Sequence, residues 1–164
     1  MKIGGKKPSA PKPETIVIPR NDGDIVFLAA AVLDDTEFDS ICPAPLPPII
    51  TKRGGAQSKD MEDRKYLEKL GQHSRKRFAW LILKSLSATP DLVWETVDLK
   101  NPDTWLLYDK ELQNSGFVQA EINRIIQGVM DANAMNDEKI QQAKDRFLRS
   151  QAVDSPSNFL REEQ

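Results

Sequence analysis

The chain has too few cysteine and histidine residues to form the sites that these residues usually build. Of its 164 residues, Cys42 is the only cysteine and His73 the only histidine. One cysteine excludes an internal disulfide, and a zinc-type site needs three or four nitrogen, sulfur or carboxylate ligands at set spacings, which the sequence does not contain. We therefore expect no metal and no cofactor, with His73 at a helix surface or boundary and Cys42 as a small buried residue.

The sequence also lacks a catalytic motif. Cys42 has no histidine near it in the sequence that could act as a base for a nucleophile. The segment GGAQSK (54–59) lacks the GxxxxGK[ST] spacing of a phosphate-binding loop, and no strand immediately precedes it. These observations predict that the protein is not an enzyme.

No sign of charge dominates, and no long apolar run is present. The 23 basic and 25 acidic residues give a formal charge of −2, which argues against a nucleic-acid partner. The basic grouping Arg75–Arg77 with Lys84 is expected to form a solvated helical face, balanced by Glu62, Asp63 and Glu68. No run approaches the ~20 apolar residues of a membrane span, and none follows the first residues as in a signal peptide. We therefore expect no membrane association and a location in the cytoplasm where the protein is made.

The eleven prolines and the glycines divide the chain into segments. We predict an α+β, mostly helical fold, in which an N-terminal β-hairpin is followed by a Pro-rich linker and a bundle of about four helices. The predicted segments are a flexible basic arm (1–13), the β-hairpin with a short helix (14–42), a Pro/Gly linker (43–59), a helical domain (60–151) and a flexible tail (152–164).

The strongest β signal lies near the N-terminus. Residues 15–18 are β-branched, residues 21–23 (Asn-Asp-Gly) favour a turn, and the apolar run 25–33 follows, so the segment predicts a hairpin. Two strands alone are marginally stable in water. The hairpin must therefore pack on helices or find a third strand from another chain. An acidic cluster after it, beginning Asp34-Asp35, is expected to cap a short solvated helix.

The stretch Glu62–Leu86 is predicted to be the central helix, within a helix from about Asp60 to Ser87 that Gly71 could kink. Its first half is charged and amphipathic, whereas Phe78–Leu83 is apolar on every side of a helix. A helix that is apolar all round is buried, either by its own fold or by a partner. Both alternatives stay open for this segment.

Further helices are expected downstream. Residues 92–97 fit a short helix or an extended segment, and Asn101-Pro102 has the pattern of a helix start that a cap at Gly116 would end. Residues 119–133 carry the clearest amphipathic pattern in the chain. A last helix is predicted from Asn136 or Asp137 to about Gln151, with Ile140 facing inward.

The candidate binding residues are apolar side chains of two predicted helices. Large aromatic side chains in partly exposed patches are preferred anchors for protein partners. The candidate partner-binding residues are Phe78, Trp80, Leu81, Ile82, Ile122 and Ile126. Association with further copies of the chain is a second expectation.

Several sequence patterns resemble those of tail assembly chaperones of tailed bacteriophages. They are a β-rich start with CP followed by prolines (25–48), WLILKSLSAT (80–89), WETVD (94–98), P-x-TW (102–105) and GF-x-x-AEINRII (116–126). The resemblance covers about Asp24 to Leu148 and leaves out the basic arm and the C-terminal tail. That family has no catalytic residues, so none is carried over.

The resemblance implies a non-enzymatic protein that binds the tape-measure protein and recruits tail-tube subunits in the host cell cytoplasm. Phe78, Trp80, Leu81 and Ile82, or the face with Ile122 and Ile126, would shield apolar patches of the tape measure. The alternative is a permanent virion component, such as a tail, neck or capsid-decorating subunit, that uses its arms to clamp its neighbours.

Overall fold

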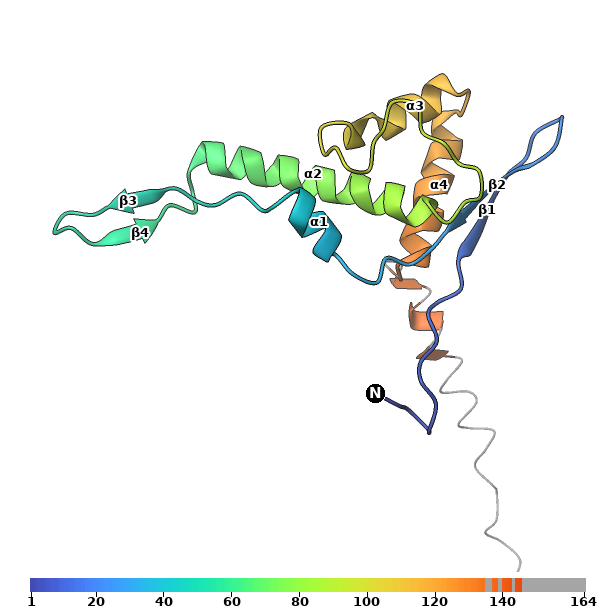
Figure 1. Cartoon of the computed structure of the whole chain (residues 1–164), viewed down its shortest axis with the longest axis horizontal. Helices are drawn as coiled ribbons and strands as arrows, with labels where there is room; N and C mark the ends of the chain where they lie inside the picture. The colour runs from blue at the N-terminus through green and yellow to red at the C-terminus, as the bar shows by residue number, and fades with distance from the viewer. Residues whose placement is uncertain (135–136, 139, 143, 146–164) are drawn as a thin grey trace, which may run out of the picture.

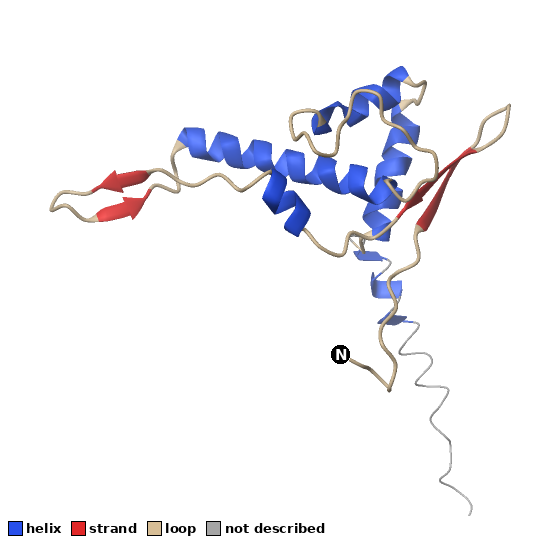
Figure 2. Ribbon diagram, in the orientation of Figure 1, coloured by secondary structure: helices blue, strands red, loops and turns tan. Residues whose placement is uncertain are grey.

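The computed structural model describes residues 1–134, 137–138, 140–142 and 144–145. The elements are β1 (Glu14–Ile18), β2 (Ile25–Ala29), α1 (Thr36–Ile41), β3 (Ile49–Thr51), β4 (Gln57–Lys59), α2 (Arg64–Leu86), the 3-10 helix η1 (Trp105–Leu107), α3 (Tyr108–Asn114) and α4 (Gln119–Ala132). The strands form two separate antiparallel pairs, β1–β2 and β3–β4. Figure 2 shows that helices make up most of the body, so the predicted α+β, mostly helical class is confirmed.

The β1–β2 hairpin lies on the helices, as one of the two sequence alternatives requires. Glu14 pairs with Ala29 and Ile18 with Ile25, so that the buried residues of both strands share one face. The predicted second strand is too long, because β2 ends at Ala29. The chain turns away at Ala30, whose N–H donates to the Ser85 carbonyl at 3.0 Å and whose carbonyl accepts from the Ser85 hydroxyl at 2.6 Å.

Helix α2 is the longest element and runs through Gly71 without a break. It begins at Arg64, four residues later than predicted, because the Asp63 carboxylate accepts from the Tyr66 N–H at 2.7 Å and caps its first turn. Its buried residues concentrate in the second half, as the loss of charge after Arg77 predicts.

Two apolar clusters meet along that second half of α2. On one side Ile82 and Leu86 join the inner face of the β1–β2 hairpin and α4. On the other side Trp80 and Leu83 pack with Phe38 of α1 and with residues that follow α2. The members from outside α2 in this second cluster are Phe38, Val97 and Trp105. The segment that is apolar all round is therefore largely enclosed by its own fold.

The connection from α2 to α4 departs from the predicted pattern. Residues 92–97 form neither helix nor strand, and Asn101 caps a turn at Asp103 (3.1 Å) rather than a helix. The helical turns begin later, with η1 and α3. Gly116 ends α3 with φ at +93°, as predicted, and the Phe117 N–H then donates to the Leu112 carbonyl at 3.1 Å.

The predicted Pro/Gly linker is wrong over its second half, which folds into the β3–β4 hairpin. Gly54 and Gly55 take positive φ values of +102° and +82° and form the turn, and the Lys52 N–H donates to the Ala56 carbonyl at 2.8 Å. The signal was weak because each strand has only three residues. Figure 1 shows this hairpin projecting from the start of α2, away from the body. We call residues 46–61 the projecting arm.

The two ends of the chain complete the description. Residues 1–13 are exposed and, apart from one β-bridge between Ile3 and Lys6, have no helix or strand. The described residues between 137 and 145 are helical, but Ile140 is exposed rather than inward as predicted. The rest of the predicted last helix, and the tail 152–164, lie outside the described residues.

Helix α4 crosses close to β1 at Gly128. A Cβ at this position would overlap the side chain of Ile16, whereas a Cβ at Gly71 of α2 would meet no atom within 4 Å. The absence of a side chain at Gly128 therefore fixes the approach of α4 to the hairpin.

We predict that Gly128→Ala lowers the free energy of unfolding by about 1–2 kcal/mol, because overpacking outweighs the gain in helix propensity. Gly71→Ala is the matched control and should raise it by up to ~1 kcal/mol, since it gains helix propensity in open space. Urea denaturation followed by circular dichroism measures both. Equal effects of the two substitutions would contradict the close approach at Gly128.

An ion pair joins the end of the hairpin to the start of α4. The Arg20 guanidinium donates to both carboxylate oxygens of Glu121, with Nη2–Oε2 at 2.7 Å, and lies over the Phe117 ring at 5.4 Å. The Val118 N–H also donates to Glu121 at 3.0 Å. The hydrogen bond from Arg20, with that from Val118, lowers the pKa of Glu121 to about 2.

This lowered pKa predicts an acid-dependent part of stability. A carboxyl group with a folded pKa below its unfolded value stabilises the protein above the unfolded pKa, and the contribution disappears as the pH falls towards the folded pKa. The difference in unfolding free energy between wild type and Glu121→Gln should therefore shrink between about pH 5 and about pH 2. Urea titrations across this range test it, and a difference that grows on acidification would refute the assignment.

Candidate binding surface

The structure separates the predicted contact residues into a buried and a surface group. Trp80, Ile82 and Ile122 are completely or almost completely buried, so they are core residues with almost no surface left for a partner. Phe78 is 37% exposed, and Leu81 and Ile126 are partly exposed. Helical periodicity shows which side chains of a helix are apolar. It does not show which of them the rest of the chain covers.

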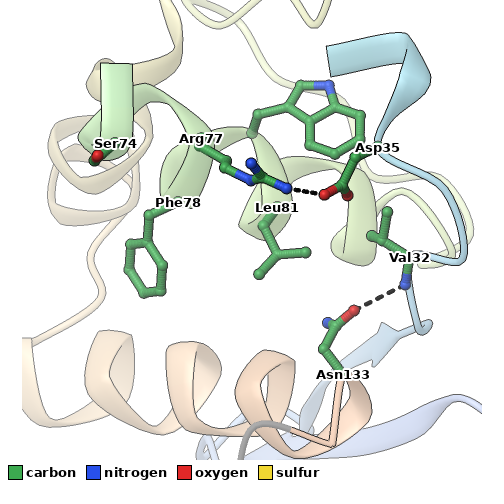
Figure 3. Close-up of a pocket in the computed structure, with 8 residues that line it drawn as sticks. Val32, Asp35, Ser74, Arg77, Phe78, Leu81 and Asn133 are labelled. Carbon is green, nitrogen blue, oxygen red and sulfur yellow. Dashed lines mark hydrogen bonds and ion pairs between the residues drawn. The ribbon is translucent and has the colours of Figure 1, made fainter. Parts of the chain in front are cut away.

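Phe78 and Leu81 lie in a groove beside α2. The groove has a volume of about 420 Å³. It is lined by Val32, Asp35, Ser74, Arg77, Phe78, Trp80, Leu81 and Asn133. Figure 3 shows the Phe78 and Leu81 side chains on the side of α2 that faces α4, with Val32 across from them on the chain between β2 and α1. We call this depression the α2 groove.

The polar groups of the α2 groove hold its walls together. The Asn133 carboxamide oxygen accepts from the Val32 N–H at 2.8 Å, and its nitrogen donates to the Val129 carbonyl at 2.8 Å. Arg77 forms an ion pair with Asp35 across the rim (Figure 3) and also lies over the Phe38 ring at 5.7 Å. These polar groups are therefore already paired within the chain. The partly exposed apolar side chains, such as Phe78 and Leu81, are the ones that another molecule could contact.

A second depression adjoins Phe78 on its other side. It has a volume of about 440 Å³ and is lined by Ser74, Arg75, Phe78, Leu106 and Tyr108. Leu106 and Leu107 of η1 are both exposed. Phe78 thus contributes to two neighbouring apolar depressions, which makes it the central exposed side chain of this surface.

The basic grouping on α2 is balanced, but by other acids than predicted. Arg77 pairs with Asp35 and Lys84 with Glu37, so the acidic cluster at α1 faces the basic side of α2. Lys76 pairs with Asp103 at 2.8 Å. The sequence indicated partners nearby in the chain, whereas the fold supplies acids that are 27–47 residues away.

Cys42 and His73 come together in the fold, but not in a catalytic arrangement. The His73 ring nitrogen Nε2 lies 3.0 Å from the Cys42 carbonyl oxygen, which is a backbone atom, and the ring packs against Phe38 with centroids 5.1 Å apart. Burial raises the pKa of the Cys42 thiol, and this opposes formation of a nucleophilic thiolate. Both residues thereby join α1 to α2.

The described residues form neither a metal-binding group nor a membrane-spanning helix. Among residues 1–134 and the short described stretches after them, no three side chains of the types His, Cys, Asp and Glu are grouped so that they could hold a metal ion. None of the helices in the same part of the chain combines the length and the apolar content of a membrane span. Comparisons of the chain with protein-family models, with curated proteins and with solved structures find no match.

The exposed apolar residues of the projecting arm were not predicted from the sequence. Leu46, Ile49 and Ile50 are exposed on it, together with Met61 at its base. The pair Ile49-Ile50 before a basic Gly-Gly turn was the available signal, but its position next to four prolines favoured an extended linker.

We predict that Trp80→Ala destabilises the protein by about 3–5 kcal/mol, because it removes a large buried side chain from between two helices. Phe78→Ala should cost less than about 1.5 kcal/mol, since more than a third of Phe78 is already exposed to water. Thermal or urea unfolding of the two variants measures the difference. A similar loss in both would mean that Phe78 is a core residue and not part of a binding surface.

Proposed function

We propose that this protein is a non-enzymatic assembly factor of bacteriophage tails, which binds the tape-measure protein and recruits tail-tube subunits. The family resemblance of residues 24–148 suggests this role. The observation that carries the proposal is the apolar surface around Phe78, where an apolar groove and a second depression lie side by side on α2.

The shape and chemistry of this surface suit a helical partner. An amphipathic helix places apolar side chains at spacings of three and four residues, and such a row fits a groove that exposes apolar side chains at the same spacing on its own helix. Phe78 and Leu81 are three residues apart and both line the groove. The contact area is small, and small interfaces suit a factor that must leave when the tube polymerises.

The second candidate is a permanent virion component, and the projecting arm favours it. A hairpin with three residues in each strand is marginal in water, yet here it extends from the body with all but one of its strand residues exposed. Clamping a neighbouring subunit would cover Ile49 and Ile50. Lys52 and Arg53 at the turn and Lys59 in β4 would direct the arm to an acidic surface.

The test is co-purification of the full chain with the tape-measure and tail-tube proteins of the same phage. Phe78→Asp and Leu81→Asp should each reduce tape-measure recovery at least tenfold, because a buried unpaired charge in the interface is costly. Val93→Asp is the matched control, since Val93 is exposed away from the groove, and it should bind as wild type does. Wild-type binding by well-folded Phe78→Asp and Leu81→Asp variants would reject the groove as the site.

Mass spectrometry of purified virions separates the two candidates. A transient assembly factor should be absent or far below the copy number of the tube subunit. Stoichiometric presence would reject the transient role and favour the clamping arm, and Ile50→Asp should then lower incorporation.

A further inference from the structure

The two edges of the β1–β2 hairpin differ in their hydrogen bonding. On β2, the Leu28 N–H donates to the Thr89 hydroxyl at 2.9 Å, and the Leu28 carbonyl accepts from the same hydroxyl at 3.0 Å. Since the backbone groups of Leu28 point away from β1, its cross-strand partner Thr15 points its own groups away from β2, and so does Val17 two residues on. Within the described residues, these N–H and C=O groups of Thr15 and Val17 have no hydrogen-bond partner.

The open edge of β1 borders a groove. Helix α4 forms the other wall, and the volume between them is about 480 Å³. The helix runs antiparallel to β1, because Arg20 after the strand bonds to Glu121 at the start of α4, and Ile16 in the middle of the strand contacts Gly128. A groove between an unpaired strand edge and a helix is the geometry into which proteins add a strand from another chain.

The two prolines that flank this edge are placed symmetrically about Ile16. Pro13 and Pro19 flank the strand at equal distances, and both lie on the same alternation as Thr15 and Val17. Antiparallel pairing of two β1 strands about Ile16 would set each Thr15 opposite Val17 of the other copy and each Pro13 opposite its Pro19. Four backbone hydrogen bonds then form, and the pairing stops at the prolines, because neither Pro13 nor Pro19 has an N–H to donate to the carbonyl of the other.

We propose that a second copy of this chain occupies the β1 edge, so that two hairpins join into one four-stranded sheet across a two-fold axis at Ile16. The proposal is independent of the tail-assembly function, because it concerns the purified protein alone. A two-fold interface uses the same patch on both copies, so the patch must be complementary to itself. The β1 edge meets this condition through its backbone groups, and the neighbouring α4 meets it through its charged side chains.

The charges of α4 are also arranged for this symmetry. Arg124 and Asp131 both line the groove, on either side of the level of Gly128, which contacts Ile16. The two-fold axis at Ile16 therefore brings Arg124 of each copy towards Asp131 of the other.

The two α4 helices must fit side by side below the joined sheet. Paired strands lie about 4.8 Å apart and packed helices about 8–10 Å apart. The fit therefore requires each α4 to lie below its own hairpin, and α4 contacts both strands, β1 more than β2.

The same pairing adds contacts between side chains on the outer face of the sheet. Val17 and Val26 face each other across the hairpin and remain 43% and 47% exposed. In the joined sheet, the row from Val26 to Val17 continues through Thr15 and Leu28 of the second copy. Two-stranded sheets are marginal in water, and four strands with a covered face are not.

A disulfide experiment tests the register. In the proposed pairing the Cα atoms of Thr15 and of Val17 in the second copy lie about 5.5 Å apart, which a disulfide can span. In a Cys42→Ser background, mixing Thr15→Cys with Val17→Cys should give a covalent dimer in a redox buffer, whereas each variant alone should not. Cross-linking of either variant alone would contradict the proposed register about Ile16, and no cross-link in the mixture would overturn the proposal.

The oligomeric state of the full chain provides a second test. Light scattering after size exclusion should find a dimer for wild type. Val17→Pro removes one N–H from the pairing edge and should weaken dimerisation about tenfold or more. Val26→Pro is the matched control, because it removes an N–H from the other edge, and it should leave the dimer unchanged. A monomeric wild type, or equal effects of the two prolines, would overturn the proposal.

Charge reversal on α4 keeps the test valid if the proline variants fail to fold. Arg124→Glu should weaken the dimer, because it sets two acids against each other across the axis. Adding Asp131→Arg should restore the dimer, since the reversed pair is again complementary. Failure of the double variant to recover above the single variant would refute the arrangement of α4 across the axis.

Discussion

The structure depends on covering one helical segment that is apolar on every side. A single layer of elements cannot cover such a segment, so the chain packs against α2 from two directions. The hairpin and α4 bury Ile82 and Leu86 on one side, while α1 and the region around η1 bury Trp80 and Leu83 on the other. Apolar burial on both sides of α2 stabilises the fold. The extent of this burial also determines which apolar side chains of α2 stay partly exposed. Phe78 and Leu81 lie where the two coverings do not meet, and the α2 groove is the result.

Polar contacts then fix the positions of these coverings. Lys84 and Arg77 hold α1 onto α2 through Glu37 and Asp35, and Ser85 and Thr89 bind the chain along the edge of β2. The same contacts leave β1 with the open edge. A sheet edge without partners attracts other strands unless something blocks it. In this hairpin the flanking prolines limit the open edge to two residues, which restricts what can bind there.

The proposed roles use surfaces on different elements. The α2 groove offers apolar side chains to a helix, the projecting arm offers a basic hairpin to an acidic surface, and the β1 edge offers backbone groups to a second copy. Because these surfaces do not overlap in their residues, the three proposed partners would not compete for the same site.

The sequence by itself determined the class of the fold, the β1–β2 hairpin, most of α2 and the bounds of α4, because these follow from local periodicity, turn residues and caps. The Asn-Asp-Gly turn and the helix cap at Gly116 depend only on residues close to them in the sequence. Both could therefore be predicted without knowledge of the rest of the chain. Tertiary structure decided which apolar side chains stay accessible, since Trp80 and Phe78 have the same helical environment and differ only in whether α1 and η1 reach them. It also decided which acids pair with Arg77 and Lys84, and which edge of the hairpin is open, because those depend on segments that are distant in sequence and meet only when the core closes.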